Sequence, residues 1–119
     1  MAVQPLAVER TSTDGFELLI VEGEIDIATS SRLIGPLNEA VTETRLPLIV
    51  DLSGVGFMDS TGLALLLNAH RRMARRGHGF AIVCPGGPLL RVFEVTDMVD
   101  TLSVRPDRGS AVRAAGASE

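Results

Sequence analysis

Length, composition and charge exclude several classes of protein. The chain has 119 residues, 45% of them hydrophobic, which suits one compact domain with one core and excludes a disordered chain. The formal net charge is −4, and every basic residue is an arginine. Without lysine the chain has neither Schiff-base chemistry nor the phosphate-binding lysine of a P-loop. An acidic chain with few aromatic residues also argues against direct nucleic-acid binding.

The N-terminal part of the chain predicts a β-hairpin followed by a helix. Residues 5–11 alternate weakly in hydropathy and predict an edge strand, residues 13–15 a turn, and residues 16–25 a second strand. Residues 28–45 predict a helix that the Gly35–Pro36 step kinks, because proline removes one backbone hydrogen bond. The residues predicted to face the core from this helix are Leu33, Leu37, Ala40, Val41 and Thr44.

The central part predicts two buried strands with a helix between them. Residues 47–55 form a nearly continuous apolar run, which is typical of a strand buried on both faces. Residues 60–76 predict the helix and residues 77–85 the second strand. The residues predicted to face inward from the helix are Leu63, Leu66, Leu67, His70 and Ala74. The basic cluster at 70–76 suits the negative end of the helix dipole, and a small anion or nucleic-acid site is the alternative.

The C-terminal part predicts shorter elements. Residues 86–96 predict a turn that enters a short helix, with Pro88 near its first turn. Residues 101–105 predict a last short strand and residues 107–115 a weak helix. We expect the chain to fray at residues 116–119.

The cysteine content and the absence of a long apolar segment indicate the compartment. Cys84 is the one cysteine, so an internal disulfide is impossible, and a buried thiol in a reducing cytoplasm is the simplest interpretation. No segment approaches the roughly 18 to 20 apolar residues that a membrane span needs. Residues 1–10 lack the basic and apolar regions of a signal peptide. We therefore expect a cytoplasmic protein that does not contact a membrane.

The order of the predicted elements, β-β-α-β-α-β-α-β-α, indicates an α/β fold. Strands that alternate with helices predict a small mixed sheet of about four to five strands, flanked by about four helices and joined by right-handed crossovers. Binding sites of such folds lie beyond the carboxyl ends of the strands. Residues 57–62, FMDSTG, lie at one such end and at the start of a helix.

This segment has three interpretations. Asp59, Ser60 and Thr61 are residue types that cap a helix N-terminus. A nucleophilic serine is disfavoured, because Met58 replaces the first glycine of the G-x-S-x-G elbow and His70 lies about 15 Å farther along the helix axis. Within the same catalytic interpretation, an aspartic protease is disfavoured too, because an extra residue breaks its Asp-Ser/Thr-Gly triplet. The third interpretation is a serine that another enzyme modifies.

Other candidate sites are weak. The spacing of His70, His78 and Cys84 does not predict a metal site, and we expect no metal, cofactor or catalytic residue. Acidic residues are more informative, since those of the second and third strands would converge beside Ser60 if these strands pair. They form either an acidic rim suited to a basic protein surface or ordinary solvated loops. These acids are Glu22, Glu24, Asp26, Asp51 and Asp59.

The whole pattern resembles the bacterial anti-sigma factor antagonists, which are small stand-alone STAS domains. The resemblance covers residues 6–113, which we take as the core of a single domain over residues 1–119. The matching motifs are GEID at 23–26, LIVDLSGVGFMDSTGL at 48–63, GFAIVCP at 79–85 and LLRVFEVTDMVDTL at 89–102. The segment 48–63 is the specific one. Ile25 in GEID stands where leucine is common.

The resemblance implies a partner switch. The unphosphorylated protein binds an anti-sigma factor that is also a serine kinase, and so frees a sigma factor. Phosphorylation of Ser60 turns binding off, and a serine phosphatase reverses it. The implied partner-binding residues are Glu24, Asp26, Asp59, Ser60, Thr61 and Gly62. Asp26 stands at the family's partner-contacting aspartate, and we expect Asp26→Ala to leave the melting temperature almost unchanged.

Some relatives in this family are not phosphorylated switches. They serve as partner-binding subunits of lipid transporters or larger signalling assemblies, and this is the alternative function. In either case we expect a binding protein rather than an enzyme, and a monomer rather than an oligomer.

Overall fold

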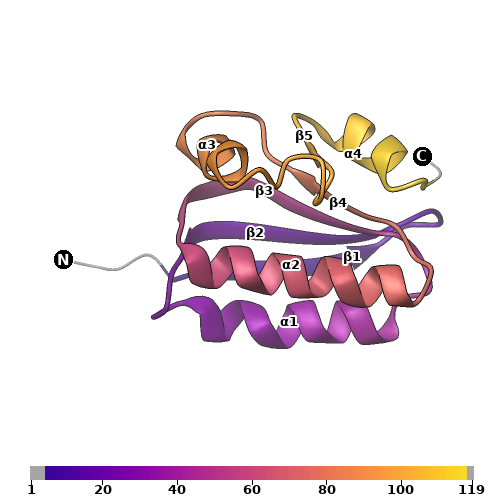
Figure 1. Cartoon of the computed structure of the whole chain (residues 1–119). Helices are drawn as coiled ribbons and strands as arrows, with labels where there is room; N and C mark the ends of the chain where they lie inside the picture. Colours follow the sequence, from indigo (N-terminus) through magenta and orange to yellow (C-terminus); the bar gives the residue numbers. More distant parts are fainter. Residues whose placement is uncertain (1–4, 118–119) are drawn as a thin grey trace.

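The computed structural model describes residues 5–117 and confirms the predicted order of elements. The elements are β1 (Ala7–Ser12), β2 (Glu17–Ile25), α1 (Ser30–Glu43), β3 (Leu48–Met58), α2 (Ser60–Arg75), β4 (Phe80–Val83), α3 (Pro88–Val95), β5 (Val104–Arg105) and α4 (Arg108–Ala114) (Figure 1). No helix in this part of the chain is long and apolar enough to cross a membrane.

The strands form one mixed sheet in the order β1-β2-β3-β4-β5. The predicted hairpin is confirmed, because β1 pairs antiparallel with β2, and the remaining neighbours are parallel. Two β-bulges interrupt the register of β2 and β3, and the paired segment ends with Ile25 opposite Met58. Consequently, the carboxyl ends of β2 and β3 lie at the same end of the sheet.

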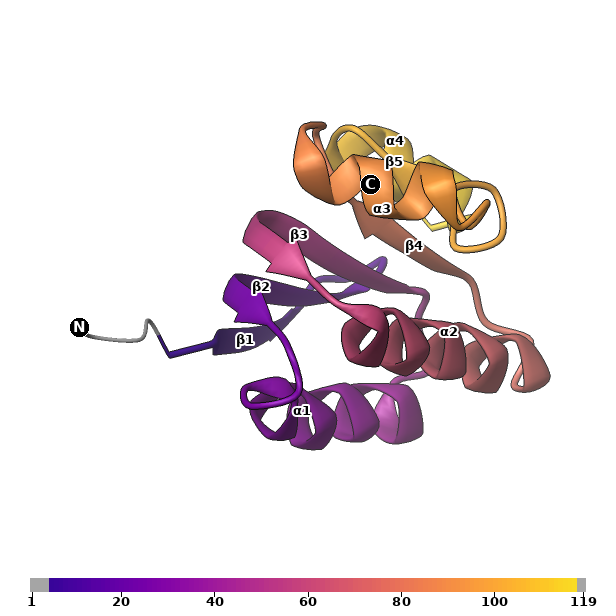
Figure 2. The same cartoon turned by 60° about the vertical axis from the view of Figure 1, so that its left-hand side comes forward.

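Helices cover both faces of the sheet. Figures 1 and 2 show α1 and α2 side by side on one face, while α4 lies on the other side of the strands. Leu19 of β2 and Val50 of β3 belong to the core under α1 and α2, whereas Leu18 and Ile49 pack with Val112 of α4. Alternate residues of one strand are thus buried on opposite faces, as predicted for residues 47–55.

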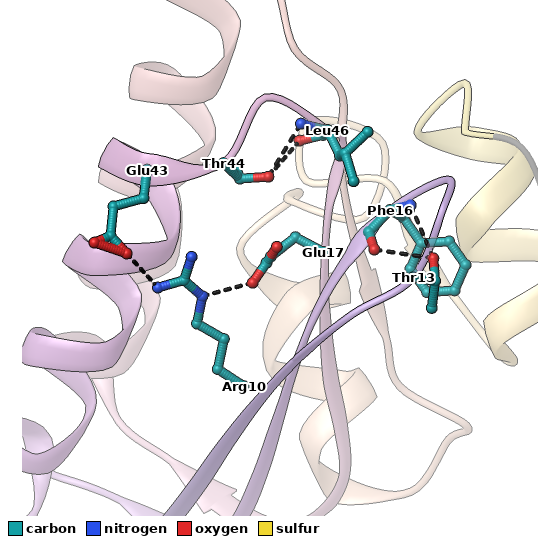
Figure 3. A network of polar contacts seen from close by, with 7 residues as sticks. All are labelled: Arg10, Thr13, Phe16, Glu17, Glu43, Thr44 and Leu46. Carbon is teal, nitrogen blue, oxygen red and sulfur yellow. Dashed lines mark hydrogen bonds and ion pairs between the residues drawn. The ribbon is translucent and has the colours of Figure 1, made fainter.

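A three-residue ion-pair network fixes the hairpin to α1. The Nε of Arg10 in β1 donates to Glu17 of β2 at 2.5 Å, and its Nη1 donates to Glu43 at the end of α1 at 2.7 Å (Figure 3). Close by, the buried Thr44 hydroxyl exchanges hydrogen bonds with the backbone of Leu46 and so caps the turn after the helix. These contacts satisfy polar groups that the fold brings out of water.

The predicted core-facing stripe of α1 is confirmed. All five of its residues are buried: Leu33, Leu37, Ala40, Val41 and Thr44. The helix continues without a break through Pro36, although proline leaves the carbonyl of Arg32 without an intrahelical donor. Arg32 is exposed, so water can solvate that carbonyl. A bend at this point remains a prediction.

The predicted stripe of α2 is partly wrong. The buried residues of this helix are Gly62, Leu66, Ala69 and Met73, at spacings of four, three and four. Ala74 is exposed and Met73 replaces it in the core, because the buried stripe lies one position earlier than predicted at this end. Two arginines of the basic cluster contact α1, since Arg72 donates to Asn38 and Thr42, and Arg76 to the carbonyl of Val41.

The C-terminal boundaries also differ from the prediction. The strand predicted at 101–105 shortens to Val104–Arg105. Fraying is wrong for Gly116 and Ala117, whose N–H groups donate to Arg113 and Val112 at 3.0 Å each. With Gly116 at φ +73°, these bonds form a Schellman motif that ends α4. Residues 118–119 lie outside the described residues.

Candidate functional site

The carboxyl ends of β2 and β3 place two aspartates beside each other. Ile25 pairs with Met58, and the N–H of Asp59 donates to the carbonyl of Ile25 at 3.1 Å. Asp26 directly follows Ile25, and Asp59 directly follows Met58. The two aspartates therefore lie at neighbouring strand ends. This pairing agrees with the condition on which the expected convergence of acids beside Ser60 depends.

Asp59 caps α2, as the composition of the segment predicts. Its Oδ1 accepts from the N–H of Thr61 at 2.9 Å and of Gly62 at 3.4 Å. Ser60 is the first residue of the helix and is exposed, whereas Thr61 is half-buried. Within residues 5–117 the Ser60 hydroxyl has no hydrogen-bond partner, so it is accessible to an enzyme that modifies it.

Asp26 shapes the turn between β2 and α1. Its Oδ1 accepts from the N–H groups of Ala28 and Thr29 at 2.9 Å each. The Thr29 hydroxyl donates in turn to the carbonyl of Glu24 at 2.7 Å. Half-buried Asp26 therefore fixes its own turn, and this local role was not apparent from the sequence. A single oxygen makes these bonds, which leaves Oδ2 available to a partner.

Gly62 is needed for packing rather than for contact with a partner. It is buried, and a Cβ atom at this position would lie 2.4 Å from Cγ of Met58 and 2.7 Å from Cγ2 of Ile25. A side chain there would push α2 away from the ends of β2 and β3. The prediction that Gly62 belongs to the partner-binding surface therefore changes, because a partner cannot reach it.

Two further acids lie along the same strand end. Glu22 and Glu24 are exposed, and Glu24 pairs with Phe57 in the register of β2 and β3. With Asp26 and Asp59 they form the acidic rim, a name used below for these four residues. Glu22 and Glu24 lie in the last part of β2, Asp26 follows that strand, and Asp59 directly precedes Ser60, the first residue of α2.

Asp51 does not belong to the acidic rim. β3 continues to Met58, so Asp51 lies in the middle of the strand and is buried. It accepts from the N–H of Ser53 at 2.9 Å and pairs with Arg108 of α4 at 2.8 Å. Burial acts to raise the pKa of Asp51, but the hydrogen bonds from Ser53 and the guanidinium of Arg108 outweigh it and hold that pKa below its usual value. Asp51 therefore fixes α4 to the sheet.

Two large apolar side chains that the sequence interpretation missed lie near the acidic rim. Ile27, in the turn after Asp26, is 81% exposed, and Phe57, next to Met58, is 49% exposed. The available signal was an isoleucine in the short segment between β2 and α1, directly after Asp26, because turns rarely need such a side chain. Two exposed apolar side chains thus accompany the four carboxylates of the acidic rim.

His70 and Cys84 are packed against the core. The ring of His70 packs edge-on against Phe80, with centroids 5.8 Å apart, in the second half of α2. Burial raises the pKa of the Cys84 thiol and so disfavours its reactive thiolate. Within residues 5–117, no three His, Cys, Asp or Glu side chains lie together as a possible metal site.

Comparison with known families agrees with this geometry. A family model for the STAS domain matches residues 7–111. The chain belongs to the STAS domain family. The matched range covers every strand and reaches into α4, in agreement with the resemblance predicted over residues 6–113.

Proteins similar to this chain include anti-sigma factor antagonists. An anti-sigma-B factor antagonist of Listeria monocytogenes is 26% identical over 104 residues, which cover 87% of this chain and 90% of that protein. An anti-sigma-B factor antagonist of Staphylococcus aureus is 29% identical over 99 residues, which cover 83% and 92%. The crystal structure of an anti-sigma factor antagonist from Mycobacterium paratuberculosis has a TM-score of 0.86 and 27% identity, with 93% and 94% of the two chains covered.

Proposed function

We propose that this protein is an anti-sigma factor antagonist controlled by phosphorylation of Ser60. The unphosphorylated form binds an anti-sigma factor with serine kinase activity and so frees a sigma factor. Phosphorylation by that partner releases the protein, and a serine phosphatase restores the binding form. The main support is that Ser60 is exposed at the N-terminus of α2 and is flanked by Asp26 and Asp59 at paired strand ends.

The fold is suited to accept a phosphate at this position. A phosphoserine at the first helical residue lies near backbone N–H groups that have no intrahelical acceptor, and the helix dipole favours an anion there. α2 has 16 residues, so its dipole is fully developed. We therefore expect phosphorylation of Ser60 to leave the fold intact.

The partner interface is expected to respond differently. Phosphorylation adds a charge of about −1.5 to −2 beside two carboxylates. A partner that meets Asp26 and Asp59 with a limited number of cations would have to bury the added charge without compensation, which costs several kcal/mol. The same modification can thus be harmless to folding and decisive for binding.

A binding role fits the surroundings of Ser60 better than catalysis. Asp59, the nearest carboxylate along the chain, already accepts N–H groups of α2 and so acts as a cap. His70 packs on Phe80 in the second half of the helix and is not placed to serve as a base.

Phosphate mapping tests the proposal. The protein is incubated with ATP and each serine-kinase anti-sigma factor encoded in the same genome, and mass spectrometry locates the phosphate. We expect modification of Ser60 by one of them, none in Ser60→Ala, and normal modification in a Thr61→Val control. A stable complex that ATP does not change would instead favour the alternative, an unphosphorylated partner-binding subunit of a larger assembly.

A further inference from the structure

Two large exposed apolar side chains lie near the paired strand ends that precede Ser60. Among residues 5–117, those markedly exposed are Ile27, Ile34, Phe57 and Val95. Single exposed apolar residues are common on protein surfaces and need no explanation. However, Ile27 and Phe57 both lie within two residues of the Ile25–Met58 pair. Both are therefore near the end of the sheet at which α2 begins.

Ile27 and Ser60 follow the two paired strand ends at the same distance in sequence. Ile27 lies two residues beyond Ile25, and Ser60 lies two residues beyond Met58, the residue paired with Ile25. A partner that covers both strand ends would meet Ser60 and Ile27 together. At 81% exposed, Ile27 has nearly its whole side chain available for contact.

Hydrogen bonds within the turn fix the backbone around Ile27 before any partner binds. The residues on both sides are fixed, since Oδ1 of Asp26 accepts from the N–H of Ala28 at 2.9 Å. The carbonyl of Ile27 itself accepts from the hydroxyl of Ser30 at 3.2 Å. Because these bonds fix the backbone of the turn, presenting Ile27 to a partner costs little backbone entropy on binding.

We propose that Ile27 is an apolar anchor for the anti-sigma factor, inserted into an apolar pocket that basic residues surround on the partner. The inference rests on the proposed function and adds the chemistry of the partner surface. The partner must match two features at once, a protruding isoleucine and the four carboxylates of the acidic rim. Phosphorylation changes the electrostatic part of this contact and leaves the apolar part unchanged.

The two parts of the contact have different kinetic effects. Exposed charges at the edge of an interface mainly set the association rate and its salt dependence, whereas buried anchors mainly set the dissociation rate. Loss of Ile27 is therefore expected to speed dissociation with little change in salt dependence. Loss of the Glu24 charge is expected to slow association and reduce the salt dependence.

The test uses Ile27→Ser with Val95→Ser as the matched control, because Val95 is 77% exposed on α3 and is also β-branched. Binding to the anti-sigma factor that phosphorylates Ser60 is measured by surface plasmon resonance without ATP. We expect Ile27→Ser to raise Kd about tenfold or more through faster dissociation, and Val95→Ser to stay within about twofold of wild type.

Three results would overturn the inference. If Ile27→Ser binds like wild type, Ile27 is not an anchor, while the proposed function stands. If Val95→Ser weakens binding equally, the effect does not belong to this face. If Ile27→Ser instead removes self-association of the isolated protein in sedimentation, the occupant is a second copy of the chain. Failure of the wild-type protein to bind any such anti-sigma factor would overturn the proposed function as well.

Discussion

The N–H of Asp59 donates to the carbonyl of Ile25 across 3.1 Å and so joins the end of β3 to the end of β2. β2 continues into the turn that holds Asp26, whereas β3 continues through Asp59 directly into α2, which begins at Ser60. The candidate site therefore depends on how closely α2 approaches this junction.

Gly62→Ala should destabilise the fold. The new Cβ would lie within 3 Å of Met58 and Ile25, and overpacking of this kind costs about 1–3 kcal/mol, part of which the better helix propensity of alanine offsets. Chemical denaturation measures the loss. Gly56→Ala is the matched control and should be almost neutral, because no atom lies within 4 Å of a Cβ there. Equal stability of Gly62→Ala and wild type would show that the close approach is unimportant.

Asp26→Ala should lower the free energy of unfolding by about 1 kcal/mol, since it removes an acceptor that satisfies two backbone N–H groups at a helix entry. The sequence-based expectation of an unchanged melting temperature is thus replaced. Asp26→Asn keeps an acceptor oxygen but removes the charge, so it should retain most of the stability and weaken partner binding. Thermal unfolding of both variants checks this. A fully stable Asp26→Ala would mean that the turn does not need the carboxylate.

Stability should fall in acid partly because of Asp51. Its pKa is lower in the folded protein than in the unfolded chain, where it is about 3.9. The ion pair with Arg108 therefore stabilises the fold fully above that value, and its contribution disappears as the pH falls through the lower, folded-state pKa.

Urea denaturation between pH 7 and pH 2.5 tests this dependence. Asp51→Asn should flatten the acid limb of the stability curve, although some slope should remain because the pKa of Asp107 is also lowered by hydrogen bonds from Ser110. Asp14→Asn, in the exposed turn of the hairpin, is the control and should keep the wild-type curve. An unchanged acid limb in Asp51→Asn would exclude Asp51 as a source of the pH dependence.

Much of the fold was predictable because its elements have strong periodicity. The stripe from Leu33 to Thr44 and the double burial of β3 both follow from hydropathy alone. The errors have local causes. Arginines on both sides of Met73 obscured its core position, and a Gly-rich segment at Gly54 and Gly56 hid the extension of β3 that places Asp51 inside the sheet.

The residue types of the candidate site were predictable from the sequence. Which of these residues caps the helix, packs in the core or is exposed was only partly predictable. The helix cap at Asp59 follows from the sequence, since Asp, Ser and Thr are preferred at a helix N-terminus. The burial of Gly62, the turn that Asp26 holds and the exposure of Ile27 depend on how β2 and β3 pair across two β-bulges. Register irregularities of this kind are not encoded in a short window of sequence.

The affinity of the phosphorylated protein for its kinase partner tests the central claim most directly. Protein phosphorylated at Ser60 and unphosphorylated protein are titrated into the anti-sigma factor by isothermal titration calorimetry, with Ser60→Ala and Ser60→Asp as variants. The account predicts that the phosphorylated form folds normally and binds more than about a hundredfold more weakly, that Ser60→Ala binds like wild type, and that Ser60→Asp binds poorly. Equal affinity of the two forms, or a phosphate located on Thr61 or Ser53, would contradict it.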